Sequence, residues 1–298
     1  MGEDIVKWAD RAMFEAAPME KDESGRVVPK VHLLWATPDP LGAIAAACRM
    51  YEGKPTYNLS DITDDERRHY WEQVQNTHLK APLEFVQFHF FIEGVTRAFT
   101  HQMVRQRTAV YAQESLRFAV KENLADEVAI PPSIAALPAD HPRREQYLQA
   151  IKRLEETYHN LVNAGIPAED ARSLLPHATT TRLNYNTNLR ALLDHAGNRL
   201  CTQAQFEWRA VFISLIRAVK EYVPHRDSDD YVQARYEWQY PHMIASTVFK
   251  PICYSLGKCP FMAVFDRQCT IRERVNEGKF NEINPLEWMA DPTAGRRE

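Results

Sequence analysis

The segment R-Q-R-x7-S-x-R contains three arginines, which are Arg105, Arg107 and Arg117. An arginine keeps its charge at physiological pH, and its planar fork matches two phosphate oxygens at once. Ser115, near the end of the segment, can add a hydroxyl and a backbone N–H donor. The pattern indicates a phosphate site, although a solvated basic helix end would have the same composition.

A second group of polar side chains follows in two pieces. Residues 171–176 (A-R-S-L-L-P) include Arg172, and taken alone they are typical of a helix end stopped by proline. The second piece contains Asn188, Arg190, Asp194 and Arg199. Two arginine-containing groups together favour a binding site for an anionic ligand.

These groups must be positioned by regular elements. We expect a short strand in VPKVHLLWATPDP, which ends in a Pro-Asp-Pro stop, and a helix over the alanine-rich residues 41–51. Thr63 and Glu66 form a T-x-x-E capping box that predicts a helix to about residue 75. Residues 83–92 alternate apolar and polar side chains at period two, which predicts a strand that Gly94 interrupts.

Helices are expected along much of the remaining chain. Residues 96–110 are predicted to continue as a helix that carries the first arginines, and the prolines between 131 and 142 predict a surface loop. Amphipathic patterns predict helices over residues 143–164, ended by Gly165, and over residues 204–222. The fold class predicted is α/β (α+β), with a central sheet and flanking helices.

Composition narrows the class of protein. Hydrophobic residues make up 45% and charged residues 26% of the chain, which excludes a fibrous or disordered protein. No apolar run is long enough to cross a bilayer and the first residues lack a signal-peptide core, so we expect no membrane association and a cytoplasmic location. A formal net charge of −4 argues against nucleic acid as a partner but allows a local basic pocket.

The five cysteines form no CxxC pair and are expected to be reduced thiols. Cys253, Cys259 and Cys269 are close enough in sequence for a zinc site, which would make the chain a zinc-stabilised interaction protein. Free buried thiols explain the same spacing more simply, so we predict no metal site.

The arginine motif resembles the signature of the flavin-dependent thymidylate synthases, which usually have histidine in the middle of the first triplet. Other family-like stretches follow in the expected order, and they are HLLWATPDPLGAIAAACRMY, the segment from His78 to Glu84, EVAIPP, ARSLLP and NLRALLDHAGNR. The resemblance covers residues 30–222, and such ordered agreement is hard to obtain by chance.

The resemblance implies an enzyme that installs the C5 methyl group of a uracil nucleotide, dUMP or UMP. It also implies an α/β protomer in a homotetramer with sites shared between subunits. FAD would bind between subunits, NADPH would be the reductant, and methylenetetrahydrofolate would be the carbon donor. Residues 1–224 would form the catalytic domain, and residues 225–298 a C-terminal extension packed on the same domain or on a neighbouring subunit.

The resemblance also implies a role for each motif residue. Arg199 would lie against the uracil edge and stabilise negative charge on the ring oxygens as C5 becomes nucleophilic, which makes it the predicted catalytic residue. The implied FAD contacts are His78, Arg105, Gln106, Arg107, Asn188 and Asp194. The implied nucleotide contacts are Gln102, Ser115, Leu116, Arg117, Arg172 and Arg199. Cys201 is the alternative nucleophile, but in this family the cofactor takes the place of an enzyme thiolate.

Two residues depart from the family pattern. Gln106 replaces the usual histidine and removes a group that titrates near neutrality. Asp194 stands where the family commonly has an amide, and its carboxylate is expected to pair with Arg190 or Arg199. One alternative is therefore a branch that methylates UMP as well as dUMP in nucleoside-antibiotic pathways. The other is a nucleotide- or RNA-binding member of the same fold that has lost catalysis.

Overall fold

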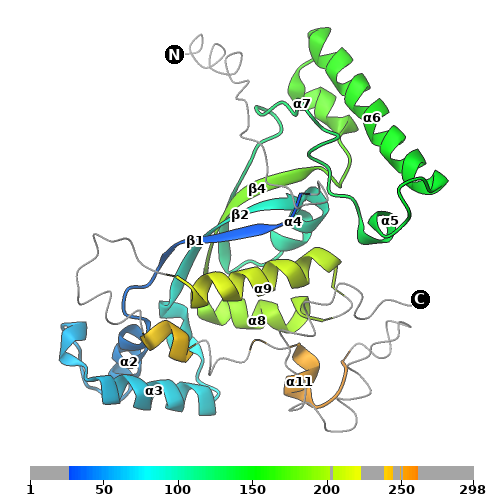
Figure 1. Ribbon diagram of the computed structural model, residues 1–298. Helices are drawn as coiled ribbons and strands as arrows, with labels where there is room; N and C mark the ends of the chain where they lie inside the picture. The colour runs from blue at the N-terminus through cyan, green and yellow to red at the C-terminus, as the bar shows by residue number, and fades with distance from the viewer. Residues whose placement is uncertain (1–26, 202–203, 223–237, 244–248, 250, 261–298) are drawn as a thin grey trace, which may run out of the picture. The chain divides into compact units, whose positions relative to one another are not determined.

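The computed structural model describes residues 27–201, 204–222, 238–243, 249 and 251–260 (Figure 1). The strands are β1 (Lys30–Ala36), β2 (Gln87–Thr96), β3 (Ala109–Gln113) and β4 (Thr180–Asn188). The α-helices are α2 (Pro40–Tyr51), α3 (Asp64–Asn76), α4 (Arg97–Met103), α5 (Pro132–Ala135), α6 (Pro142–Asn163), α7 (Ala168–Ala171), α8 (Leu189–Arg199), α9 (Phe206–Lys220) and α11 (Ile252–Leu256). Short 3-10 turns are η1 (Leu59–Asp61), η2 (Ala81–Phe85) and η3 (Arg172–Leu174).

The chain divides into two compact units. Of the described residues, unit 1 contains 27–30, 92–105 and 112–183, and unit 2 contains 31–91, 106–111 and those from 184 onward. The predicted domain boundary at residue 224 lies outside the described residues.

In the described part of the chain, the strands form one four-stranded sheet in the order β1-β2-β4-β3. The backbone N–H of Thr37, just after β1, donates to the carbonyl of Gln87 at the start of β2, so these strands run in opposite directions. The N–H of Leu189, just after β4, likewise donates to the carbonyl of Val86. A sheet combined with helices confirms the predicted α+β class.

Strand β2 supplies the centre of the apolar core. The period-two prediction is confirmed, because Phe88, Phe90 and Ile92 are fully buried. The prediction that Gly94 interrupts the strand is wrong, because β2 continues to Thr96. Gly94 has a φ of 72°, and a β-carbon there would collide with the carbonyl oxygen of Val28. Glycine is therefore needed inside the strand for close backbone approach.

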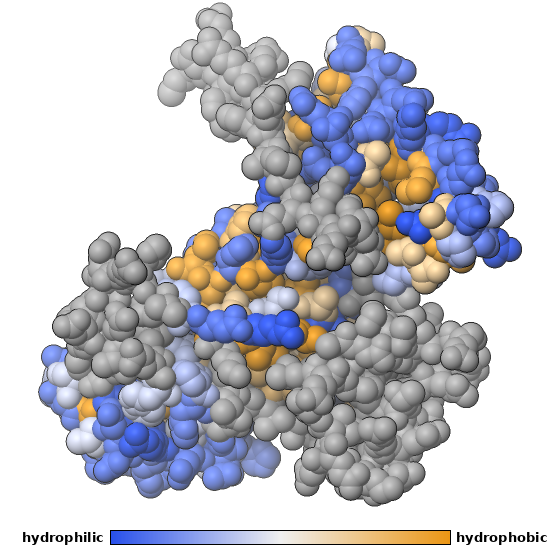
Figure 2. Space-filling model, in the orientation of Figure 1, coloured by the Kyte–Doolittle hydropathy of each residue, from blue (hydrophilic) through white to orange (hydrophobic). Residues whose placement is uncertain are grey.

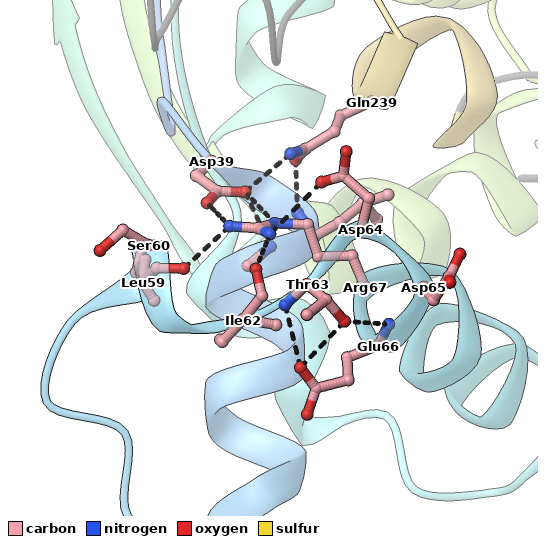
Figure 3. Close-up of polar contacts among 12 residues, drawn as sticks. Asp39, Leu59, Ser60, Ile62, Thr63, Asp64, Asp65, Glu66, Arg67 and Gln239 are labelled. Carbon is pink, nitrogen blue, oxygen red and sulfur yellow. Dashed lines mark hydrogen bonds and ion pairs between the residues drawn. The ribbon is translucent and has the colours of Figure 1, made fainter.

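A buried polar cluster joins α2 to α3 in unit 2 (Figure 3). Asp39 caps α2 by accepting from the N–H of Gly42 at 2.9 Å. The fully buried Arg67 of α3 donates to both carboxylate oxygens of Asp39, at 2.6 and 3.1 Å. Gln239 donates to Asp39 over 2.8 Å and accepts from the N–H of Leu41 over 3.0 Å. Gln239 therefore packs against the N-terminal end of α2, although it lies about 200 residues later in the sequence.

Helix α6 in unit 1 confirms the amphipathic prediction. It begins after His141, which caps it through Nδ1, and its C-terminal end is followed by Gly165 at a φ of 83°. Ile151 packs in a small core with Leu124 and Val128. In Figure 2, hydrophilic residues dominate the visible surface of this helix and apolar residues follow one side.

Two predictions about secondary structure are corrected. Residues 96–110 are not one helix, since α4 ends at Met103 and β3 begins at Ala109. Val110 and Tyr111 are residue types that favour extended structure. Pairing with β4 at the edge of the sheet stabilises the strand more than the weak helical pattern favours a helix. The prediction of a loop between residues 131 and 142 omitted the short helix α5. No helix in the described segments is long and apolar enough to span a membrane.

Candidate active site

The end of the arginine motif forms a turn in unit 1 directly after β3. The carbonyl of Ser115 accepts from the N–H groups of Phe118 and Ala119, and its Oγ accepts from the N–H of Arg117 at 3.3 Å. Leu116 is 9% exposed, so its side chain anchors the turn in the core and any ligand would contact its backbone. The side chain of Arg117 is half exposed.

Glu169 brings two predicted arginines together. Its carboxylate lies 2.8 Å from Nε of Arg117, and its backbone carbonyl accepts from Nε of Arg172 at 3.0 Å. Sequence reasoning placed both arginines at a phosphate but did not identify Glu169, which lies three residues before Arg172. Two guanidiniums around one acidic residue form a cationic patch.

Arg97 is a further arginine that sequence reasoning missed. Its Nη2 donates to the carbonyl of Glu114 at 2.8 Å, while its buried Nε has no hydrogen-bond partner among the described residues. Burial lowers the pKa of Arg97, Glu114 counteracts this, and the nearby charge of Arg172 lowers the pKa further. A bound anion would accept a hydrogen bond from this buried N–H and would also offset the charge of the two guanidinium groups.

An ion cluster around the buried Lys121 holds Glu114, the residue before the Ser115 turn. Nζ of the fully buried Lys121 lies 3.2 Å from Glu114 and 2.6 Å from Glu127. Thr181 of β4 donates to the Glu114 carboxylate at 3.2 Å. The residue directly before Ser115 is therefore fixed in unit 1 through the side chains of Lys121 and Thr181.

Gln102 and Arg105 lie in unit 1 at the end of α4. The N–H of Arg105 donates to the carbonyl of Gln102 at 3.3 Å. The Arg105 side chain is exposed and makes no hydrogen bond or ion pair with any described residue. It is available to an anionic ligand.

Gln106 occupies the middle of the first triplet and belongs to unit 2. Both ends of its side-chain amide form hydrogen bonds within this unit. Nε2 donates to the carbonyl of Ala191 at 2.9 Å, and Oε1 accepts from the hydroxyl of Tyr185 at 2.7 Å. Tyr111, stacked on Tyr185 with ring centres 5.4 Å apart, donates to the Gln106 backbone carbonyl. Burial raises the pKa of Tyr111 to about 12 and also raises that of Tyr185, so both phenols stay protonated donors.

Helix α8 carries the remaining predicted residues. Asn188 caps it, because Oδ1 accepts from the N–H of Ala191 at 2.8 Å. Arg190 lies 2.7 Å from Glu84 and 4.0 Å from the exposed carboxylate of Asp194. The expected pairing of Asp194 with Arg190 is thus present at the outer limit of an ion pair.

Arg199 ends α8, with Nε 3.2 Å from Nε2 of His195 and its guanidinium over the ring of Trp208 at 4.7 Å. Cys201 follows the helix and is partly exposed. Among the described residues no group of three or more His, Cys, Asp or Glu side chains could hold a metal ion. Cys269 of the zinc alternative lies outside the described residues.

The residues described above lie within a segment that is similar to proteins of known family. The family model described as "Thymidylate synthase complementing protein" matches residues 32–225, well over half of the chain. The chain belongs to the flavin-dependent thymidylate synthase family. The match contains the arginine motif, Arg172 and every predicted residue of α8.

Two relatives share the family name. A protein named flavin-dependent thymidylate synthase from Geobacter sulfurreducens is 34% identical over 202 residues, which is 65% of this chain and 84% of that protein. One from Pyrococcus abyssi is 30% identical over 249 residues, 82% of this chain and 95% of that protein. A crystal structure of the Helicobacter pylori enzyme complexed with FAD and dUMP covers 63% of this chain and 93% of its own, at 20% identity and a TM-score of 0.49.

The donors in unit 2 fit the chemistry of a dinucleotide such as FAD. Arg107 and His78 are exposed and make no hydrogen bond or ion pair with any residue in the described ranges. The amide oxygen of Asn188 is used in the cap, which leaves its NH₂ group as a donor for a carbonyl or ring nitrogen. The Asp194 carboxylate, by contrast, would repel a phosphate.

Proposed function

We propose that the chain is an FAD-dependent methyltransferase that converts dUMP into its C5-methyl product, with methylenetetrahydrofolate as carbon donor and NADPH as reductant. The observation that carries this proposal is the family match over residues 32–225, which includes Arg105, Arg117, Arg172 and Arg199. The alignments with the two relatives that share the family name extend over most of each relative, 84% of one and 95% of the other.

The cationic patch of unit 1 is proposed to bind the nucleotide phosphate. Arg117 and Arg172 each use Nε on Glu169, and each fork has terminal nitrogens with which it can bind phosphate oxygens. The Nε of Arg97, which no described residue satisfies, supports a ligand anion near Arg172. Ser115 adds its hydroxyl, and Gln102 at the end of α4 is proposed as a further contact.

FAD is proposed to be held by Arg105, Arg107, His78 and Asn188. When bound, it supplies the reducing step that turns the transferred one-carbon unit into a methyl group. Gln106 is proposed to hold the motif in place, because its amide is already used on Ala191 and Tyr185. Asp194, exposed on α8, is proposed to modulate flavin affinity.

Arg199 is proposed to act on the uracil ring. When C5 attacks the one-carbon unit, negative charge develops on the ring oxygens, and a guanidinium at that edge stabilises it. As the new carbon–carbon bond forms, the one-carbon unit separates from the folate nitrogens and tetrahydrofolate leaves. The C5 proton is released to solvent, and the hydride that completes the methyl group derives from NADPH. No enzyme nucleophile such as Cys201 is needed for this balance.

The assembly and the domain division are also proposals. A homotetramer with shared sites is supported by large apolar side chains exposed in unit 2, among them Leu34, Phe85 and Val110, the last 71% exposed. Residues 1–224 are proposed as the catalytic domain. The contacts of Gln239 with Asp39 and Leu41 support an extension, residues 225–298, that packs on this same domain.

The test is the release of tritium from 5-tritiated nucleotide by the FAD-loaded chain. We expect a yellow protein that releases tritium only when methylenetetrahydrofolate and NADPH are both present. Running dUMP and UMP side by side measures the ribose preference and hence the UMP-methylating alternative. A protein that binds dUMP and FAD without releasing tritium would instead be the nucleotide-binding member without turnover.

A further inference from the structure

Two side chains of unit 2 hold the guanidinium of Arg199. His195, one helical turn earlier on α8, lies with Nε2 at 3.2 Å from Nε of Arg199. Trp208, from α9, places its ring centre 4.7 Å from the guanidinium carbon. The first contact fixes one edge of the planar group and the second fixes its face.

The contact with His195 requires a neutral imidazole. Nε of arginine carries a hydrogen, and its lone pair is delocalised over the guanidinium and cannot accept, so Nε2 of His195 must accept and the imidazole proton must lie on Nδ1. Burial, and then the adjacent charge of Arg199, lower the pKa of His195 to about 3. The imidazole is therefore neutral at any pH near neutrality, and it remains an acceptor.

The imidazole is itself fixed by aromatic packing between α8 and α9. Its ring meets Trp208 edge to face at 4.8 Å and Phe212 at 5.7 Å. His195 is 9% exposed and Trp208 is fully buried. Close packing leaves such rings few alternative rotamers, so they form a rigid support for a long side chain that would otherwise sample many conformations.

We propose that His195 and Trp208 are positioning residues that hold Arg199 in the orientation needed at the uracil ring. The proposal rests on the proposed function, in which Arg199 stabilises charge on that ring. A donor that is already oriented stabilises developing charge without reorganisation during the reaction. Loss of either support should therefore lower kcat more than it raises KM for dUMP.

The kinetic test uses full-length, FAD-loaded variants. His195→Phe keeps an aromatic ring but removes the acceptor, and we expect kcat to fall about 10-fold or more while KM for dUMP and the flavin absorbance stay unchanged. His195→Gln restores an acceptor at a similar distance and should recover most of the lost kcat. Trp208→Phe should give a smaller loss in the same direction, because phenylalanine is a weaker partner for a cation.

Phe212→Leu is the matched control for packing. Phe212 lies on α9 and touches the ring of His195, as Trp208 does, so its truncation also loosens the interface between α8 and α9. We expect it to lower the Tm with a smaller effect on kcat than His195→Phe. Equal kcat losses in Phe212→Leu and His195→Phe, scaling with the loss of Tm, would reduce the role to general stability and overturn the proposal.

A second measurement does not depend on turnover. Phenylglyoxal modifies guanidinium groups, and peptide mass spectrometry gives the modification rate of Arg199 alone. We expect faster modification in His195→Phe than in the wild type and a near wild-type rate in His195→Gln. If the wild type shows no turnover, the proposed function fails while this rate still decides the positioning. Equal rates in the wild type and His195→Phe would overturn the positioning role.

Discussion

The side-chain amide of Gln106 donates to the backbone carbonyl of Ala191 over 2.9 Å, across 85 positions of sequence. Ala191 belongs to the first turn of α8, whose cap is Asn188. Tyr185 donates to the other end of the same amide at 2.7 Å. Within unit 2, the residue that departs from the family signature is therefore bonded to the helix that carries Arg199.

Gln106→Glu should destabilise the protein by about 1–3 kcal/mol, because a carboxylate oxygen would face the Ala191 carbonyl and cannot donate to it. Urea denaturation of the FAD-free protein measures the change. Gln75→Glu makes the same substitution at an exposed position of α3 and should change the free energy of unfolding by about 0.5 kcal/mol or less. Equal effects in the two variants would show that the Gln106 contacts contribute no stability.

Arg117→Ala and Arg172→Ala should each raise KM for dUMP by about 10- to 100-fold, since each removes charged donors from the phosphate. The increase in KM of the double variant should be smaller than the product of the two single increases, because the arginines share Glu169. Initial rates at varied dUMP measure this. Arg153→Ala, an exposed arginine of the same unit, is the control and should leave KM unchanged. An unchanged KM in Arg117→Ala would show that the nucleotide phosphate does not bind at this patch.

Lys121→Met should cost about 3–5 kcal/mol, because it leaves the carboxylates of Glu114 and Glu127, which are only 12% and 16% exposed, without a cation. It should also raise KM for dUMP, since Glu114 precedes Ser115. Thermal unfolding and dUMP kinetics provide the two measurements. Lys54→Met, which breaks the exposed pair with Glu52, should leave both unchanged. A variant as stable as the wild type would contradict the role of this cluster.

The Asp39 cluster predicts a defined dependence of stability on pH. Burial by itself raises the pKa of Asp39, but the donors from Arg67, Gln239 and Gly42 outweigh it and hold the pKa below its ordinary value. The resulting stabilisation is complete above the unfolded pKa, about 4, and is lost as the pH falls through the lower folded value.

The measurement is urea denaturation of the wild type and Asp39→Asn at several pH values. The wild type should be the more stable at pH 6, and the difference should shrink as the pH falls below about 4. Asp65→Asn, at an exposed carboxylate in the first turn of α3, should show no comparable trend. A difference between wild type and Asp39→Asn that is constant with pH would contradict a stabilising carboxylate.

Much of the local structure was predictable from short-range chemistry. The capping box of Thr63 and Glu66 is present at the start of α3, and the alternation around Phe88 gave the core strand. Strand β4 was not predicted. Its threonines at 180, 181 and 187 are buried and favour extended structure, but this polar segment lacks the apolar alternation that reveals a strand.

The remaining features depend on contacts that spacing along the chain does not reveal. Asp39 meets Gln239 across 200 positions, and Arg117 meets Glu169 across 52. The motif predicted Arg117 and Arg172 as site residues, but no local pattern predicted Arg97 beside them or His195 beneath Arg199. Such partners are set by tertiary packing, which outweighs local propensity.

Mass spectrometry of the nucleotide produced from dUMP distinguishes a methylating enzyme from a protein that only binds the nucleotide. With FAD-loaded protein, methylenetetrahydrofolate and NADPH, we expect a product heavier by one CH₂ unit, formed in proportion to the NADPH consumed. Arg199→Ala should give no such product under the same conditions. Unchanged dUMP after incubation with wild-type protein that retains its FAD would show that the chain does not catalyse the proposed reaction.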